Sequence, residues 1–259
     1  MKAHSLEFRF RFLIHFVIIL VGFTAPWDRW LHIDSSGPNA HVWGTLAAWL
    51  AMLKPGAGGI GIAAAFNLIL AVGILCAVGA AALRTWGSAY LGASVVKAHT
   101  FQGASVVAAG PYRRVRNPLY LGTMLHVLAL ALLMPPSGAI FSIVAIGFFQ
   151  VRLILGEEAF LSGQLGEPYL AYCARVPRLL PALRPRVPSS HTRAAWGTAL
   201  LGEIYMWGVA IAFISVGYRY NAFLITQGVI ISLGVSLVAR ALLPKSPAEP
   251  GGLAAMDTE

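Results

Sequence analysis

Long apolar stretches dominate this chain of 259 residues and constrain its fold more than any other feature. Six runs of 16 to 24 residues contain at most one charged residue each. They lie at 12–27, 60–83, 119–134, 139–155, 194–217 and 221–243. A helical membrane crossing takes about 20 predominantly apolar residues. The sequence therefore predicts an all-α, polytopic helical membrane protein with about six transmembrane helices.

The composition excludes an ordinary soluble domain. Apolar residues make up 58% of the chain and charged residues 11%, whereas soluble domains average about 45–50% and about 25%. Two cysteines, Cys76 and Cys173, exclude a disulfide framework. A 13-residue apolar piece at 41–53 is too short to cross a bilayer, so we expect an interfacial or re-entrant helix there.

The positions of the basic residues predict the topology. With six crossings and a cytoplasmic N-terminus, 16 of the 19 basic residues fall on the cytoplasmic side, and only Arg29, Lys54 and Arg219 fall outside. Both termini are therefore expected in the cytoplasm, with the first apolar run kept as a helix rather than removed as a signal peptide. Because topology accounts for the net charge of +9, we expect no nucleic acid partner.

The alternation of apolar and polar stretches divides the chain into five parts. We expect N-terminal transmembrane helices at 1–83, a core with a helical hairpin at 84–181, a Pro/Arg-rich linker at 182–195, a C-terminal transmembrane hairpin at 196–243 and a disordered tail at 244–259.

The hairpin in the core is the most informative prediction. Only the short sequence Pro-Pro-Ser-Gly at 135–138 separates two apolar runs, which forces an antiparallel helix pair with axes about 8–10 Å apart. The polar segment 110–118 and the pair Glu157–Glu158 then meet at one cytoplasmic corner. Pro118 suits the first turn of a helix, where free backbone N–H groups attract an anion, and Arg116 would reinforce that site.

The side chains at this corner favour a zwitterionic, cationic or nucleoside-like ligand. Adjacent carboxylates accept hydrogen bonds from amino groups or ribose hydroxyls, and Tyr112 and Tyr120 can cover a flat ring or a cation. Simpler interpretations remain for each part. The arginines near 113–116 are also a topology signal, and the carboxylate pair could be a solvated helix end with Arg152 as partner. Tyr169 and Tyr172, three residues apart, favour an interfacial belt.

Four motifs in a fixed order give this region a family resemblance. They are Gly110-Pro111-Tyr112, then Val115-Arg116-Asn117-Pro118-Leu119-Tyr120-Leu121-Gly122, then Glu157-Glu158 with Leu161, and last Leu165-Gly166-Glu167-Pro168-Tyr169-Leu170-Ala171-Tyr172 leading to Arg175-Val176-Pro177-Arg178. With these motifs the segment 84–181 resembles the membrane methyltransferase family that includes isoprenylcysteine carboxyl methyltransferases and phospholipid N-methyltransferases.

The resemblance implies a cofactor, S-adenosylmethionine, at the cytoplasmic corner and a lipophilic small-molecule or lipidated acceptor that enters from the membrane lipid. The residues that would contact the cofactor are Val107, Tyr112, Asn117, Pro118, Tyr120 and Glu157, together with Arg116. Arg152, Arg175 and Glu158 are the candidate acceptor-binding or catalytic residues. The family often has His where this chain has Asn117, and an amide cannot titrate near pH 7.

Methyl transfer from a sulfonium requires alignment, exclusion of water and, for an amine acceptor, a base, for which Glu157 or Glu158 is available. No metal is expected, because no two of the seven histidines lie three to five residues apart. The alternatives are an NADPH-dependent sterol-type membrane reductase, which shares part of the motif order, and a non-catalytic membrane module. Glu203, inside the fifth run, predicts either a structural pair with Ser236 or Arg240 or an acceptor pocket.

Overall fold

The computed structural model describes residues 5–24, 41–53, 59–91, 108–190 and 192–242. Every regular element among these residues is helical. The N-terminal part contains α1 (Ser5–Arg9), α2 (Arg11–Thr24), α4 (Val42–Met52) and α5 (Ile62–Leu91). The central part contains η1 (Gly110–Arg113), α7 (Pro118–Ala131), α8 (Pro136–Leu165) and α9 (Glu167–Arg175). The C-terminal part contains α10 (Trp196–Gly202), α11 (Ile204–Val216), η2 (Gly217–Arg219) and α12 (Ala222–Leu242).

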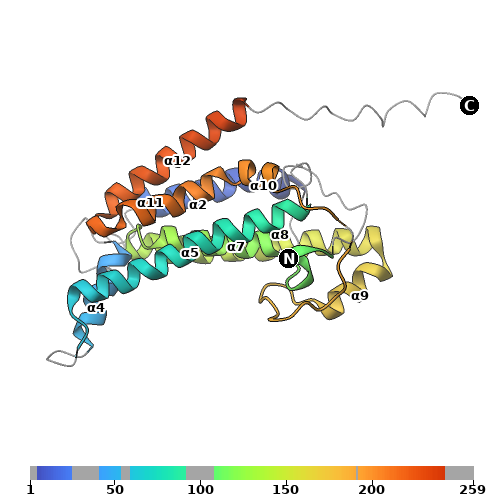
Figure 1. Ribbon diagram of the computed structural model, residues 1–259, viewed down its shortest axis with the longest axis horizontal. Helices are drawn as coiled ribbons and strands as arrows, with labels where there is room; N and C mark the ends of the chain where they lie inside the picture. The colour runs from blue at the N-terminus through green and yellow to red at the C-terminus, as the bar shows by residue number, and fades with distance from the viewer. Residues whose placement is uncertain (1–4, 25–40, 54–58, 92–107, 191, 243–259) are drawn as a thin grey trace, which may run out of the picture.

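The longer helices lie roughly along one axis of the molecule, with α4 at one end and α9 at the other (Figure 1). Helix α5 is central, because it packs against α4, α7, α10 and α11. Helix α2 packs against α8, and α12 packs against α11. The all-helical fold class is confirmed, and the predicted antiparallel hairpin is formed by α7 and α8.

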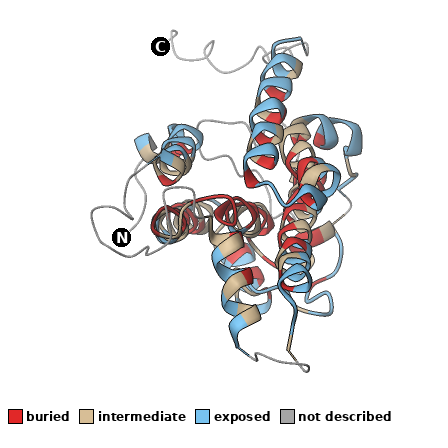
Figure 2. Cartoon of the chain, turned by 90° about the vertical axis from the view of Figure 1, so that its left-hand side faces the viewer, coloured by how far each residue is buried: buried red, intermediate tan, exposed pale blue. Residues whose placement is uncertain are grey.

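Within the described ranges, three helices, α5, α8 and α12, are long and apolar enough to cross a membrane. Helices α10 and α11 make a fourth if this pair, bent by 65°, counts as one span. Many of their large apolar side chains are exposed, among them Leu75, Val144 and Ile231. Figure 2 shows exposed residues along the helices of the molecule. Such faces suit an integral membrane protein, because acyl chains would cover them. Each of the six apolar runs contains a helix in the part that the structure describes, but α2 and α7 are short, so six crossings stay a prediction.

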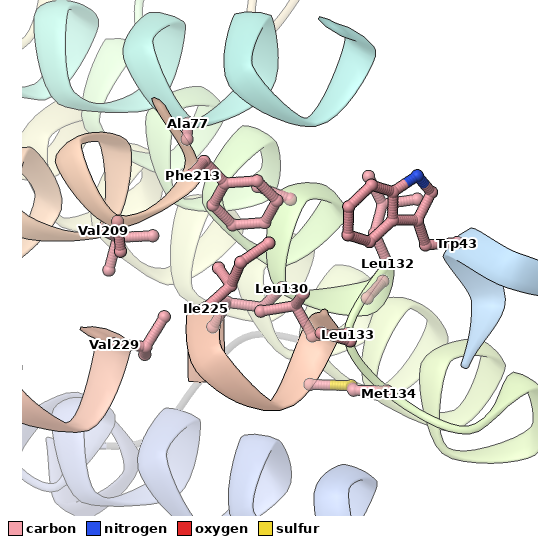
Figure 3. Packing of buried hydrophobic residues seen from close by; sticks show 14 of the residues in the cluster. Trp43, Ala77, Leu130, Leu132, Leu133, Met134, Val209, Phe213, Ile225 and Val229 are labelled. Atoms are coloured by element: carbon pink, nitrogen blue, oxygen red, sulfur yellow. The ribbon is translucent and has the colours of Figure 1, made fainter. Parts of the chain in front are cut away.

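The largest group of buried apolar side chains lies away from the α9 end of the molecule. It joins α4, the end of α7, α11 and α12 through Trp43, Leu130, Phe213 and Ile225 (Figure 3). The backbone N–H groups that begin α4 donate to carbonyl oxygens after α7, Val42 to Met134 and Trp43 to Leu132, each at 3.0 Å. These bonds satisfy helix-end donors that have no partner within the helix. The 41–53 piece is therefore a short helix fastened to the α7–α8 turn.

Two glycines allow α2 and α8 to touch along their backbones, which makes a substitution there costly. A Cβ at Gly138 would overlap the carbonyl oxygen of Gly22. We expect Gly138→Ala to destabilise the protein by about 1–3 kcal/mol, because a backbone contact cannot yield as a flexible side chain does. Thermal unfolding in detergent measures this change. Gly163→Ala on the same helix is the control, since a Cβ there meets nothing within 4 Å; equal unfolding temperatures for the two variants would contradict the prediction.

Candidate functional site

The α7–α8 hairpin brings the predicted polar segments together. Helix α8 continues through the carboxylate pair to Leu165, so both carboxylates lie beside the start of α7. The Tyr120 hydroxyl donates to Glu157 Oε2 at 3.1 Å, and Asn117 Nδ2 donates to Glu158 Oε1 at 3.2 Å. Helix α7 begins at Pro118 and has no side-chain cap, as the anion-site prediction requires. The predicted corner is therefore present.

Glu158 is the centre of an ion-pair network. Arg178 Nη2 lies 2.8 Å from Glu158 Oε2, and Arg116 Nη1 lies 3.2 Å from Oε1. The carboxylate is buried, and its hydrogen bond raises the pKa of Arg178. Asn117 Nδ2 also approaches the carbonyl oxygen of Arg178 at 3.2 Å. The carboxylate pair is thus not a solvated helix end. The motif order placed Arg178 near the site without assigning it a role.

The proline-rich segment after α9 is extended and lies along the start of the site. Four of its hydrogen bonds join its backbone to residues 108–116. They run from Arg116 N to Pro177 O (2.9 Å), from Ala182 N to Arg114 O (2.9 Å), from Arg186 N to Arg113 O (2.8 Å) and from Ser190 N to Ala108 O (2.8 Å). This pairing holds Arg178 over Glu158 and fixes η1, where Gly110 has a φ of +53° that favours glycine.

Three tyrosines form the interior of this end of the molecule. Tyr169 and Tyr172 are buried with Val176 and Val187, and the Tyr172 hydroxyl donates to the backbone oxygen of Tyr112 at 2.8 Å. The predicted interfacial belt is wrong, because the extended segment folds back and covers these rings. Burial raises the pKa of Tyr112 and of Tyr172 well above the usual value, so both hydroxyls stay protonated. The Tyr112 hydroxyl and Arg116 Nε are buried and have no hydrogen-bond partner among the described residues.

The N-terminal helices cover another side of the corner. Phe8 packs against Phe149 and Leu153, and Tyr120 packs against this group. Glu7 pairs with Arg152 Nη2 at 2.9 Å, which ties α1 to α8. Arg11 is buried and lies over the ring of Phe8, 4.1 Å from its centroid, and its charge acts on Tyr120 and Glu157. Sequence reasoning missed Arg11, because it belongs to the basic N-terminal group expected from topology alone.

The remaining predicted site residues lie in three different settings. Arg152 pairs with Glu7 rather than with the carboxylate pair that the sequence interpretation offered as its partner. Arg175 ends α9 and is exposed. Val107 lies outside the described residues.

Glu203 has a different partner from either one expected. Arg84 Nε donates to Glu203 Oε2 at 2.8 Å, and Ser88 Oγ donates to Glu203 Oε1 at 3.0 Å. The predicted pairing with Ser236 or Arg240 is wrong, because the carboxylate binds Arg84 and Ser88. Arg240 instead donates to the carbonyl of Gly202 at 3.3 Å. The two helices α5 and α10 pack against each other, which brings Arg84 to Glu203 across 119 residues of sequence.

The segment that carries most of this corner is similar to a known protein family. Residues 68–167 match the phospholipid methyltransferase family. The match confirms the resemblance drawn from the motifs, and it runs from α5 to the end of α8, including Asn117, Tyr120, Glu157 and Glu158. No curated protein and no solved structure matches this chain.

Proposed function

We propose that the protein is an S-adenosylmethionine-dependent methyltransferase that acts on a small lipophilic acceptor, an isoprenylcysteine carboxylate or a related lipid, at the membrane. The observation that carries the proposal is the paired arrangement of Tyr120 with Glu157 and of Asn117 with Glu158 at the start of α7. Both pairs lie within the segment that matches the phospholipid methyltransferases. This match favours a methyltransferase over the reductase alternative.

The side chains present fit this cofactor, which carries an amino acid group, a cationic sulfonium and an adenosine. Tyr112 Oη and Arg116 Nε are buried donors without a partner among the described residues, so each can bind an oxygen or nitrogen acceptor. The backbone N–H groups of Leu119 and Tyr120, in the first turn of α7, have no partner within the helix and suit a carboxylate. Glu157, with the Tyr120 hydroxyl as its one side-chain hydrogen bond among the described residues, retains lone pairs for an amine or a hydroxyl.

When bound, S-adenosylmethionine supplies a methyl group that is already activated by its sulfonium. The chain then has to orient the acceptor, exclude water and, for an amine, accept one proton. We assign proton acceptance to Glu157, because Glu158 already accepts hydrogen bonds from Asn117 and Arg178 and forms an ion pair with Arg116. Glu158 then orients Asn117 and the arginines.

Arg152 and Arg175 remain proposed acceptor-binding residues from the family resemblance, and Val107 a proposed cofactor contact. We also propose that the site faces the cytoplasm and that both termini lie in the cytoplasm. The distribution of basic residues supports this orientation.

The test is calorimetric titration of the detergent-purified protein with S-adenosylhomocysteine and, separately, with NADPH. We expect micromolar binding of S-adenosylhomocysteine alone, followed by labelled-methyl transfer into lipid extracts. Binding of NADPH alone would move these residues to the reductase alternative, and binding of neither would favour a non-catalytic module.

A further inference from the structure

A buried ion pair joins the C-terminal helices to the family segment at one side of α7. Arg84 on α5 and Glu203 form two hydrogen bonds, Nε to Oε2 at 2.8 Å and Nη2 to Oε1 at 3.0 Å. Their side chains are only 12% and 4% exposed. Glu203 lies at the 65° bend between α10 and α11, outside the segment that matches the phospholipid methyltransferases. The pair therefore links two parts of the chain that the family match separates.

The third nitrogen of the Arg84 guanidinium binds α7. Nη1 donates to Thr123 Oγ1 at 2.8 Å and approaches the backbone oxygen of Leu119 at 3.3 Å. Both acceptors belong to the first two turns of α7, which also carry Tyr120. At about 100° per residue, Leu119 and Thr123 share one face of the helix, while Tyr120 points toward α8. Arg84 thus supports the turn from one side while the carboxylates contact it from another.

Gly122 makes room for this arrangement. A Cβ at this position would lie 2.5 Å from Arg84 Cγ, so the arginine side chain crosses the α7 backbone at a place where no side chain stands. A guanidinium presents its donors in a rigid planar fork, and binding Glu203 through two of its nitrogens sets the direction of the third. The orientation of Nη1 toward α7 therefore depends on a carboxylate at the α10–α11 bend.

We propose that Arg84, held by Glu203, is a positioning residue that fixes the first turns of α7 and thereby the placement of Asn117 and Tyr120 in the cofactor site. The C-terminal hairpin is then part of the machinery that shapes the site. The effect on α7 follows from the contacts of Arg84, and its consequence for the cofactor rests on the proposed function.

Two variants and a matched control test this role. Arg84→Lys keeps a cation opposite Glu203 but loses the fork that reaches α7, and Thr123→Val removes the hydroxyl on α7 without touching the ion pair. Ser88→Ala is the control. It removes the 3.0 Å hydrogen bond that Ser88, on α5, donates to the Glu203 carboxylate, and it leaves the contacts of Arg84 with α7 in place. Hydrogen exchange of the backbone amides at 121–123 and affinity for S-adenosylhomocysteine are measured for all three full-length proteins.

We expect faster exchange at 121–123 and weaker S-adenosylhomocysteine binding, by about tenfold in Arg84→Lys and about threefold in Thr123→Val, with no change in Ser88→Ala. Unchanged exchange in Arg84→Lys would overturn the proposal. If Ser88→Ala changed exchange and affinity as much as Arg84→Lys does, the proposal would also be overturned. Arg84, Ser88 and Glu203 would then act only through general packing. If the unaltered protein does not bind S-adenosylhomocysteine, the proposed function fails, whereas the exchange rates still decide the role of Arg84.

Discussion

Glu157→Gln is expected to weaken binding of S-adenosylhomocysteine by about 10- to 100-fold and to lower methyl transfer at least as much. The Glu157 carboxylate accepts a hydrogen bond from the Tyr120 hydroxyl at 3.1 Å. We assign to it a hydrogen bond from the cofactor and, for an amine substrate, acceptance of the proton. A hydrogen bond to a charged group contributes about 1.5–3 kcal/mol, which gives this range. The amide keeps the shape of the side chain but removes its charge. Calorimetry and a labelled-methyl assay measure the two effects.

Two further variants show whether the loss belongs to the site. Glu167→Gln makes the same chemical change at the exposed start of α9 and is expected to leave affinity and transfer unchanged. Tyr120→Phe removes only the hydroxyl, so we expect a smaller loss than in Glu157→Gln. If Glu157→Gln and Tyr120→Phe both leave affinity unchanged, the cofactor does not bind at this corner.

Glu158→Ala is expected to lower the stability of the folded protein by about 3 kcal/mol. Glu158 is 8% exposed, accepts hydrogen bonds from Arg178 and Asn117, and forms an ion pair with Arg116. Removing one partner of a buried ion pair leaves the other charge uncompensated, which costs about 3–5 kcal/mol, and some of that cost is recovered here because Arg178 is half exposed. For a chain of this size the unfolding temperature should fall by roughly 6–12 °C. Thermal unfolding in detergent measures it.

Arg178→Gln is the comparison for this prediction. Its side chain is 48% exposed, so water compensates much of the lost attraction, and we expect a loss of less than about 1 kcal/mol. A large loss in Arg178→Gln together with a small one in Glu158→Ala would show that the extended segment, and not the buried carboxylate, stabilises this end of the molecule.

Much of the candidate site could be predicted because its parts are local in sequence or joined by one short turn. Pro118 begins α7 as expected, and the short break predicted at 135–138 leaves no other arrangement than an antiparallel pair. The turn itself lies at 132–135, because Pro136 already begins α8. Helix geometry then places Asn117 and Tyr120 opposite the carboxylates. The contacts of Arg178 and Tyr172 could not be predicted in the same way, since they depend on the path of a proline-rich segment that has no periodic pattern.

The helical class, the α7–α8 hairpin and the meeting of Glu157 and Glu158 with the start of α7 follow from the amino-acid sequence, because apolar length and short turns act over a few residues. Which cation meets which carboxylate depends on how the helices pack in three dimensions. Arg84 pairs with Glu203, Arg152 with Glu7, and Arg178 with Glu158. These pairs are separated by 119, 145 and 20 residues. A buried charge must find a partner, but which one lies within reach is set by how the helices pack, and packing has no local signature in the chain.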